Sequence, residues 1–280
     1  MAEPSSTAAS SASLPAAAGA ISNAFATAKT EGRAALMPYL MGGFPDQETA
    51  TAVANAYADA GADLIELGVP FSDPLADGPT IHAADTAALA AGATLDSVLE
   101  TCAAVGDRIP VALMVYANMI LARGVEEFGA LAAGAGAAGV IVPDLPLEEQ
   151  GAIGAAVGEH GMPLIPLVAP TTPPVRRAEI CAKALGFVYL VSTVGVTGER
   201  QDLPPELTEL ISAAKEEAAV PVAVGFGIST PHQAARVGEV ADGVIIGTRL
   251  VRAVADAPDR DGALAAVTEF LRETRDALAR

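Results

Sequence analysis

Eight short runs rich in Val, Ile and Leu recur along the 280-residue chain and constrain its fold more than any other feature. They are nearly continuous in apolar residues, a pattern typical of strands that are covered on both faces, as in parallel sheets. The runs are "AALMPYLMG" (34–42), "ADLIELGVP" (62–70), "PVALMVYAN" (110–118), "AGVIVPDLP" (138–146), "MPLIPLVAP" (162–170), "FVYLVSTVG" (187–195), "PVAVGFGIS" (221–229) and "DGVIIGTRL" (242–250).

Ala-rich segments of helical length separate these runs, for example at 46–62, 125–139, 147–161 and 172–186. Several carry helix start signals, such as Asp46, the pair Pro173-Pro174, and Thr230 followed by Pro231. Eight β-then-α units predict an α/β protein with a single-domain (β/α)8 TIM barrel over residues 16–280. A doubly wound open sheet is the alternative, but "MGGFPD" does not supply its Gly-rich first turn.

Two further segments complete the predicted organisation. A helix over about 17–31 precedes the first strand and is expected to cover the barrel floor. Residues 1–15, rich in Ala, Ser and Pro, are expected to form a disordered tail. The stretch 81–105 has room for one long helix or two shorter ones.

Composition excludes several classes of protein. A formal net charge of −18 argues against a nucleic-acid or anionic-membrane surface. No apolar stretch approaches the roughly 18 residues of a membrane helix. Cys102 and Cys181 are far apart without metal-ligand spacing, which is consistent with a reducing cytosol and a cytoplasmic protein without a metal site.

A carboxylate interrupts the second apolar run. Glu66 lies among Leu64, Ile65, Leu67 and Val69, and the chain has no Lys or Arg between residues 33 and 108. A buried carboxylate is paired, protonated or used in chemistry, because leaving it charged and unpaired is costly. An apolar pocket would raise its pKa towards neutrality, where it can give and take a proton. The alternative is a structural carboxylate with a partner from elsewhere in the chain.

Asp77 follows in the next loop and is the second candidate. In barrels of this kind the working residues lie at the C-terminal ends of strands and in the loops beyond them. A polar loop should leave Asp77 ionised, so the two carboxylates would form an acid/base pair with separated pKa values. Pro70, Pro74 and Pro79 stiffen the loop. A stiff loop could position Asp77 and also present a surface to a partner; the alternative is a rigid connection without either role. Asp73 is expected to serve the turn or a contact.

Three glycine-containing turns follow the sixth, seventh and eighth runs, at 192–200, 225–230 and 245–250. Phosphate sites in such barrels use the late loops and a helix N-terminus. Gly247 and Thr248 opening a short helix, with Gly227 allowing close approach, predict a phosphate site; the alternative is plain turns. Glycines on either side of Thr197 suggest a loop that closes over substrate, or an ordinary flexible loop.

The pocket wall has apolar candidates near the ends of the predicted strands, and each is alternatively a core residue. Tyr189 offers a hydroxyl beside the carboxylates. Asp144 and Asn118 also follow predicted strands. Each is expected either to contact the substrate or to stabilise its loop. The wall candidates are Tyr39, Met114, Tyr116 and Phe226.

The segment "IELGVPFSDPLADGPTI" (65–81), with "MVYAN", "VPDLP", "STVGVTG" and "GFGIS", resembles the tryptophan synthase alpha subunit family in order from about residue 20 to the C-terminus. The first segment is specific to that family, while the phosphate-loop pieces are shared more widely. The resemblance implies retro-aldol cleavage of indole-3-glycerol phosphate to indole and glyceraldehyde 3-phosphate. Glu66 would then be the proton-shuttling acid/base, and Asp77 would hold the indole N–H.

The resemblance also assigns the supporting residues. Tyr189 matches the active-site tyrosine and Thr197 the threonine of the closing loop. The phosphate-holding turns match Gly198, Gly227, Gly247 and Thr248. Three positions depart from the usual pattern: Thr248 replaces Ser, Arg249 replaces a small residue, and Tyr39 replaces a pocket Phe.

The family works with a beta subunit that carries pyridoxal phosphate, in an alpha2beta2 tetramer, and receives indole from the alpha subunit. The loop 70–79 and the turn 142–146 would form the docking face. No cofactor is expected in this chain, whose three lysines (Lys29, Lys183, Lys215) fall in helical segments. The alternatives are another phosphate-binding barrel enzyme, a stand-alone lyase, or a catalytically silent stimulatory subunit, which retention of Glu66 and Asp77 disfavours.

Overall fold

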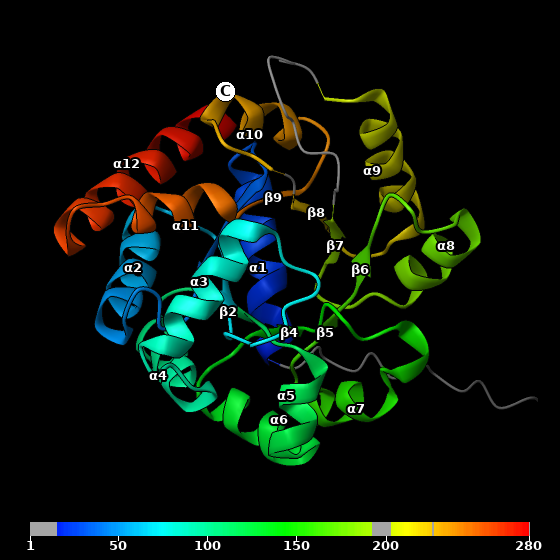
Figure 1. The fold of residues 1–280 in the computed structure, drawn as a ribbon. Coiled ribbons are helices and arrows are strands. Elements are labelled where there is room, and N and C mark those ends of the chain that lie inside the picture. The colour runs from blue at the N-terminus through cyan, green and yellow to red at the C-terminus, as the bar shows by residue number, and fades with distance from the viewer. Residues whose placement is uncertain (1–15, 192–202, 226, 280) are drawn as a thin grey trace, which may run out of the picture.

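The computed structural model describes residues 16–191, 203–225 and 227–279, and these form a ring of helices around parallel strands (Figure 1). The strands are β1 Ala35–Met41, β2 Ile65–Gly68, β3 Val111–Met114, β4 Gly139–Ile141, β5 Leu164–Ile165, β6 Leu167–Val168, β7 Val188–Val191, β8 Val222–Gly225 and β9 Gly243–Ile246. The predicted (β/α)8 barrel with an additional N-terminal helix is confirmed. The tail expected at 1–15 lies outside the described residues.

The helices follow the strands in alternation. They are α1 Ala16–Thr30, α2 Gln47–Asp59, α3 Pro79–Ala90, α4 Leu95–Val105, α5 Ala117–Arg123, α6 Val125–Gly134, the 3-10 turn η1 Leu147–Glu149, α7 Gly151–Glu159, α8 Pro174–Lys183, α9 Pro205–Glu217, α10 Pro231–Gly238, α11 Thr248–Ala255 and α12 Arg260–Leu278.

The barrel closes through the fifth apolar run of the sequence. The hydrogen-bonded order is β5-β4-β3-β2-β1-β9-β8-β7-β6, with every pair parallel. Pro166 separates β5 from β6, and its carbonyl accepts the Tyr189 N–H at 2.9 Å. Because proline has no N–H to donate, the run is divided in two. Its first half pairs with β4 and its second with β7, so the eight predicted strands become nine short ones without a change of topology.

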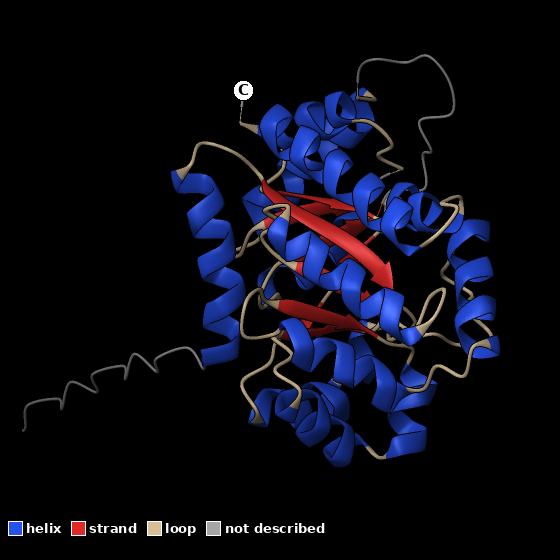
Figure 2. Ribbon diagram, turned by 90° about the vertical axis from the view of Figure 1, so that its left-hand side faces the viewer, coloured by secondary structure: helices blue, strands red, loops and turns tan. Residues whose placement is uncertain are grey.

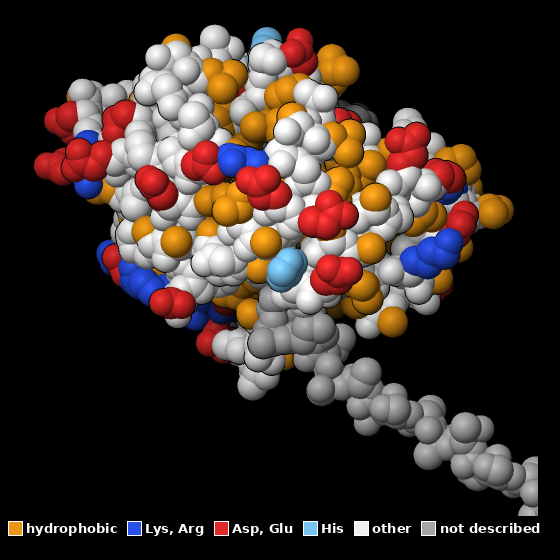
Figure 3. Space-filling view, turned by 90° about the horizontal axis from the view of Figure 1, so that it is seen from below, with side chains coloured by type: hydrophobic (Ala, Val, Ile, Leu, Met, Phe, Trp, Pro, Cys, Tyr) orange, Lys and Arg blue, Asp and Glu red, His pale blue; other side chains and the backbone are white. Residues whose placement is uncertain are grey.

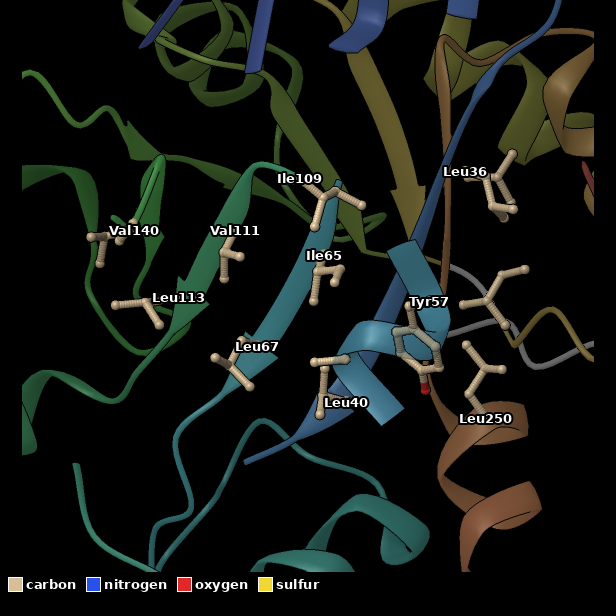
Figure 4. Packing of buried hydrophobic residues seen from close by; sticks show 14 of the residues in the cluster. Leu36, Leu40, Tyr57, Ile65, Leu67, Ile109, Val111, Leu113, Val140 and Leu250 are labelled. Carbon is tan, nitrogen blue, oxygen red and sulfur yellow. The ribbon is translucent and has the colours of Figure 1, made fainter. Parts of the chain in front are cut away.

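Side chains of each strand alternate between two apolar layers. On the outer face, Leu36, Leu40, Ile65 and Leu67 are buried against the surrounding helices, together with Tyr57 of α2 (Figure 4). On the inner face a second cluster fills the barrel itself. The run around Glu66 is therefore apolar throughout because both faces of its strand are covered, as expected for a parallel sheet.

Helix α1 covers the end of the barrel at which the strands begin (left side of Figure 2). Its residues Ile21, Phe25 and Ala28 are buried in the inner cluster, where the ring of Phe25 lies 5.6 Å from that of Phe187. The helix also packs on β1 and β4. The prediction that an N-terminal helix covers the barrel floor is confirmed.

Several predicted helices have different boundaries. The stretch 81–105 forms two helices, α3 and α4, because Thr94 begins α4 with a capping box shared with Ser97. The segment 147–161 divides into η1 and α7, and α5 begins at Ala117, so the last two residues of the predicted run 110–118 are helical. Asp46 and Thr230 act as N-caps, as predicted, and accept the N–H groups of Thr49 and Gln233.

The surface agrees with the charge of the sequence. Acidic side chains are scattered over the face drawn in Figure 3, and no broad basic patch covers it. Within the described residues no single helix is long and apolar enough to span a bilayer. Only α3 and α4 taken together meet that composition, and they are bent by 105° at their junction.

We expect Phe25→Ala to lower the free energy of unfolding by about 3–5 kcal/mol, because a large side chain leaves a cavity between α1 and the inner cluster. Asn23→Ala, an exposed position on the same helix, should change stability by no more than about 0.5 kcal/mol. Urea denaturation of both variants measures the difference. Equal stability of the two would mean that α1 is not part of the cooperative core.

Candidate active site

Glu66 lies inside the barrel, at the centre of β2. In the parallel register it is level with Tyr39 of β1 and Ala112 of β3, which belong to the inward-facing set. Only 1% of the residue is exposed. The sequence prediction of a carboxylate within a buried strand is confirmed, and its side chain shares the barrel interior with apolar groups.

The partners of Glu66 are few and uncharged. The Tyr189 hydroxyl donates to Oε2 at 3.4 Å, which is long for an O–H···O bond, and Oε1 has no hydrogen-bond partner among the described residues. Burial raises the pKa of Glu66 to about 8, with a smaller opposing effect from Tyr189 and a further increase from the nearby charge of Asp77. No cation pairs with Glu66 in the described part of the chain, so the alternative of an ion-paired structural carboxylate is not supported.

Asp77 is held in the loop between β2 and α3. The Tyr116 hydroxyl donates to its Oδ2 at 2.9 Å and accepts the Ala76 N–H at 3.0 Å. Burial raises the pKa of Asp77 above its usual value, while the bond from Tyr116 and the charge of His82 lower it. The sequence predicted an ordinary ionised carboxylate in a polar loop; the half-buried setting instead moves its pKa in the same direction as that of Glu66.

Two glycines make room for the hydroxyls beside Glu66. A Cβ on Gly68 would lie 2.3 Å from the Tyr39 hydroxyl, and one on Gly225 would lie 2.6 Å from the Tyr189 hydroxyl. Since Cβ contacts below 3.0 Å are essentially never observed, any larger residue would displace these tyrosines. Both glycines end their strands, and sequence reasoning did not identify them, because each sits in an otherwise ordinary apolar run.

Two of the candidates for the pocket wall lie in an apolar cluster. Tyr39 is buried in a cluster with Met41, Ile81 and Val251, and Met114 packs against it. The guanidinium of Arg249 lies over the ring of Phe270, 4.9 Å from its centroid, which accounts for that departure from the family pattern as a packing contact. Phe226 lies outside the described residues.

The late turns are described in part. Gly247 precedes α11, which begins at Thr248, so the predicted short helix opens at the predicted position. Gly227 has a φ of 24°, in the region that favours glycine. The predictions for Thr197 and Gly198 fall on residues outside the described part of the chain.

The other loop candidates have structural contacts. Asp144 accepts the Ala117 N–H at 2.9 Å, at the first residue of α5, and Asn118 is part of that helix. Asp73 is exposed and accepts the Ser72 hydroxyl at 2.6 Å. The contacts of Asp144 and Asp73 agree with the structural alternative for these two residues.

Two polar residues gain importance from the structure. Tyr116, predicted only as an apolar wall residue, is the hydrogen-bond donor to Asp77. Asp85, on the buried face of α3, was not predicted at all. The sequence offered one signal: Asp85 lies eight residues after Asp77, in an Ala-rich segment of helical length, where a charged side chain is unusual.

Two other kinds of site are relevant by their place in the fold: a metal site and a groove away from Glu66. Among the described residues no group of three or more His, Cys, Asp or Glu side chains is placed to hold a metal ion. A groove of about 920 Å³ opens at the opposite end of the barrel, between α1, α9, α10 and α12, far along the strands from Glu66. The fold defines a (β/α)8-barrel, and its buried carboxyl groups lie where enzymes of this fold hold their catalytic residues, towards the C-terminal ends of the strands.

Comparison with known proteins identifies the family within this class. The family model for the tryptophan synthase alpha chain matches residues 25–279. The tryptophan synthase alpha chain of Picosynechococcus sp. is 44% identical over 262 residues, covering 92% of this chain and 99% of the relative, and that of Prochlorococcus marinus is 48% identical over 240 residues, covering 85% and 87%. A structure of Mycobacterium tuberculosis tryptophan synthase superposes with a TM-score of 0.86 at 36% identity, covering 93% of this chain and 98% of the other.

The chain belongs to the tryptophan synthase alpha chain family. It is a carbon–carbon lyase of tryptophan biosynthesis that cleaves indole-3-glycerol phosphate to indole and glyceraldehyde 3-phosphate. The alpha-chain reaction needs no cofactor, since pyridoxal phosphate belongs to the beta chain. The resemblance drawn from "IELGVPFSDPLADGPTI" is thereby confirmed for the family, the fold and the reaction.

The raised pKa of Glu66 predicts a pH-dependent stability difference between the wild type and Glu66→Gln. Between about pH 4.5 and 8 the folded state retains a proton that the unfolded chain releases, so ionisation favours unfolding as the pH rises through this window. Glu66→Gln lacks this contribution, and its free energy of unfolding should increase relative to wild type over that range and level off above it. Urea titrations at several pH values measure the difference; Glu100→Gln, at an exposed position, is the control. Curves for wild type and Glu66→Gln that stay parallel would contradict the assignment.

Proposed function

We propose that Glu66 is the proton shuttle of the cleavage and that Asp77 stabilises the charge on the indole ring. The observation that carries the proposal is the buried carboxyl group of Glu66, which has a free Oε1, a neutral tyrosine as its partner and a pKa of about 8. Such a group is mostly protonated at neutral pH and can therefore donate a proton. Once ionised, it can act as a base in a later step.

The proposed reaction uses one proton in two steps. Glu66 first gives its proton to C3 of the indole ring, which forms the indolenine tautomer with a positive nitrogen. The resulting carboxylate then removes the proton of the 3′-hydroxyl. The C–C bond breaks, its electron pair returns to the ring and neutralises the nitrogen, and the alkoxide becomes the aldehyde. Glu66 ends protonated, as it began.

Asp77 is proposed to accept the indole N–H and to favour the positive charge that develops on that nitrogen. A negative charge placed where positive charge forms stabilises the transition state most when it is fixed in advance. The hydrogen bond from Tyr116 holds one oxygen of Asp77 and leaves the other available. Tyr189 is proposed to orient Glu66, and Tyr39 and Met114, with Phe226, to enclose the apolar ring.

The phosphate group is proposed to bind at the late turns. The free N–H groups at the start of α11 and the Thr248 hydroxyl suit an anion, because a helix N-terminus carries partial positive charge. Gly198 and Gly227 are proposed to supply further backbone contacts, and Thr197 to belong to the loop that closes over the substrate. This assignment requires no lysine, in agreement with the scarcity of basic residues.

We further propose that the chain acts in the cytoplasm as part of an alpha2beta2 tetramer, in which indole passes to a beta subunit. The docking face would be the loop 70–79 and the turn 142–146. Support comes from Leu75, which is 96% exposed at the tip of this proline-stiffened loop.

Indole release from indole-3-glycerol phosphate tests the catalytic proposal. Glu66→Gln should lower kcat by a factor of roughly 10²–10⁴, since it removes general acid–base catalysis while retaining shape. Binding of the substrate, measured by calorimetry, should change little, and Glu100→Gln should keep wild-type turnover. Retained turnover in Glu66→Gln, or unfolding of that variant, would refute the proton-shuttle role.

The docking face is tested by substitution of its exposed apolar residue. Leu75→Asp should weaken binding to the beta subunit by more than about tenfold, since it places a charge in a buried contact. Leu185→Asp, an exposed leucine after α8, is the matched control. Light scattering of the mixed subunits gives the stoichiometry, and a mass that does not correspond to two chains of each kind would overturn the tetramer.

A further inference from the structure

Asp85 is a buried carboxyl group to which the proposed reaction gives no role. It lies on α3 with 1% of its surface exposed, next to Ile81, Ala84 and Ala88, which pack in the apolar cluster at the barrel mouth. Its Oδ1 accepts the Phe71 N–H at 3.0 Å, and Oδ2 has no hydrogen-bond partner among the described residues. Burial, opposed by the hydrogen bond from the Phe71 N–H and assisted by the charge of Asp77, raises its pKa to about 7.

A buried carboxyl group with an unsatisfied oxygen is unfavourable for stability alone. An apolar residue of similar size would fill the same space in this cluster without the loss of solvation. The single bond that Asp85 makes goes to the backbone of the loop between β2 and α3. The position is therefore better explained by what that bond does for the loop.

A continuous set of contacts links Asp85 to Asp77. The ring of Phe71 stacks on that of Tyr116, with centroids 5.1 Å apart and planes 28° apart. The Tyr116 hydroxyl donates to Asp77 and accepts the N–H of Ala76. The loop is thus fixed near its start, at Phe71, by Asp85 and near its end, at Ala76 and Asp77, by Tyr116, and the two fixed points contact each other through the Phe71 ring.

We propose that Asp85 is a positioning residue of the active site, which fixes the Asp77 carboxylate by holding the Phe71 N–H from α3. The proposal rests on the role proposed for Asp77. Without the acceptor at residue 85, Phe71 loses its backbone anchor, its ring no longer holds Tyr116 in place, and the carboxylate of Asp77 samples positions that do not meet the indole N–H. Small displacements of a catalytic group have large effects on rate.

Three substitutions separate this role from a general effect on folding. Asp85→Asn keeps an oxygen acceptor for Phe71 and removes the charge, whereas Asp85→Ala and Asp85→Leu remove the acceptor; leucine suits the apolar surroundings and guards against misfolding. Thr86→Ala, exposed on the same helix, is the control. We expect kcat/KM to fall about tenfold in the Ala and Leu variants and to stay within about twofold of wild type in the Asn and Thr86 variants.

The same assay in an Asp77→Asn background tests the route of the effect. If Asp85 acts through Asp77, adding Asp85→Leu to Asp77→Asn should lower kcat/KM by no more than about twofold further, because residues that act as a unit are not additive. Hydrogen exchange of the peptide covering 69–78 should be faster in Asp85→Leu and unchanged in Asp85→Asn.

Each contrary result has a distinct meaning. A full additional tenfold loss in the double variant, or an Asp85→Asn variant as impaired as Asp85→Leu, would overturn the positioning role of Asp85. Wild-type activity of Asp77→Asn would instead overturn the role of Asp77 in the reaction, and with it the basis for the route through Phe71 and Tyr116.

Discussion

The proposed active site depends on one unfavourable interaction, the burial of the Glu66 carboxyl group without a cation among the described residues. Transfer of an ionised carboxylate into an apolar interior is so costly that the group keeps its proton instead, and this sets its pKa near the range in which proton transfer is useful. A lysine or arginine in the barrel would stabilise the fold and remove the reactivity. The described surroundings of Glu66 accordingly include the neutral Tyr189 and Tyr39, with the glycines that accommodate their hydroxyls, and the nearby charge of Asp77 raises its pKa.

The loop after β2 carries Asp77, and hydrogen bonds hold this loop in place relative to the buried Glu66. Both Tyr116, which precedes α5, and Asp85 of α3 make hydrogen bonds to this loop. Burial raises the pKa of Glu66 to about 8 and that of Asp85 to about 7, so the mouth of the barrel carries less negative charge near neutral pH than its composition suggests. An anionic substrate benefits from that reduction, since like charges repel.

Much of the fold follows from the sequence because strand and helix signals are local. The apolar runs predict both the strands and their burial, and Asp46 and Thr230 mark helix starts by their own side chains. Glu66 stands out for the same reason, as a charge within such a run. The residues that sequence reasoning misses act across the chain: Asp85 on the backbone of Phe71, Tyr116 on Asp77, and Gly225 by the atoms it lacks. Their roles depend on which segments are neighbours in space, and this cannot be predicted from a local sequence pattern.

Helix α1 and the inner apolar cluster also determine how molecules move through this barrel. Ile21 and Phe25 are buried at the end where the strands begin, and they belong to the apolar cluster that fills the barrel interior. Helix α1 therefore covers one end of the barrel. Substrate must enter, and both products must leave, on the face that bears the carboxylates, so any protein bound over that face would receive the released indole before the solvent does.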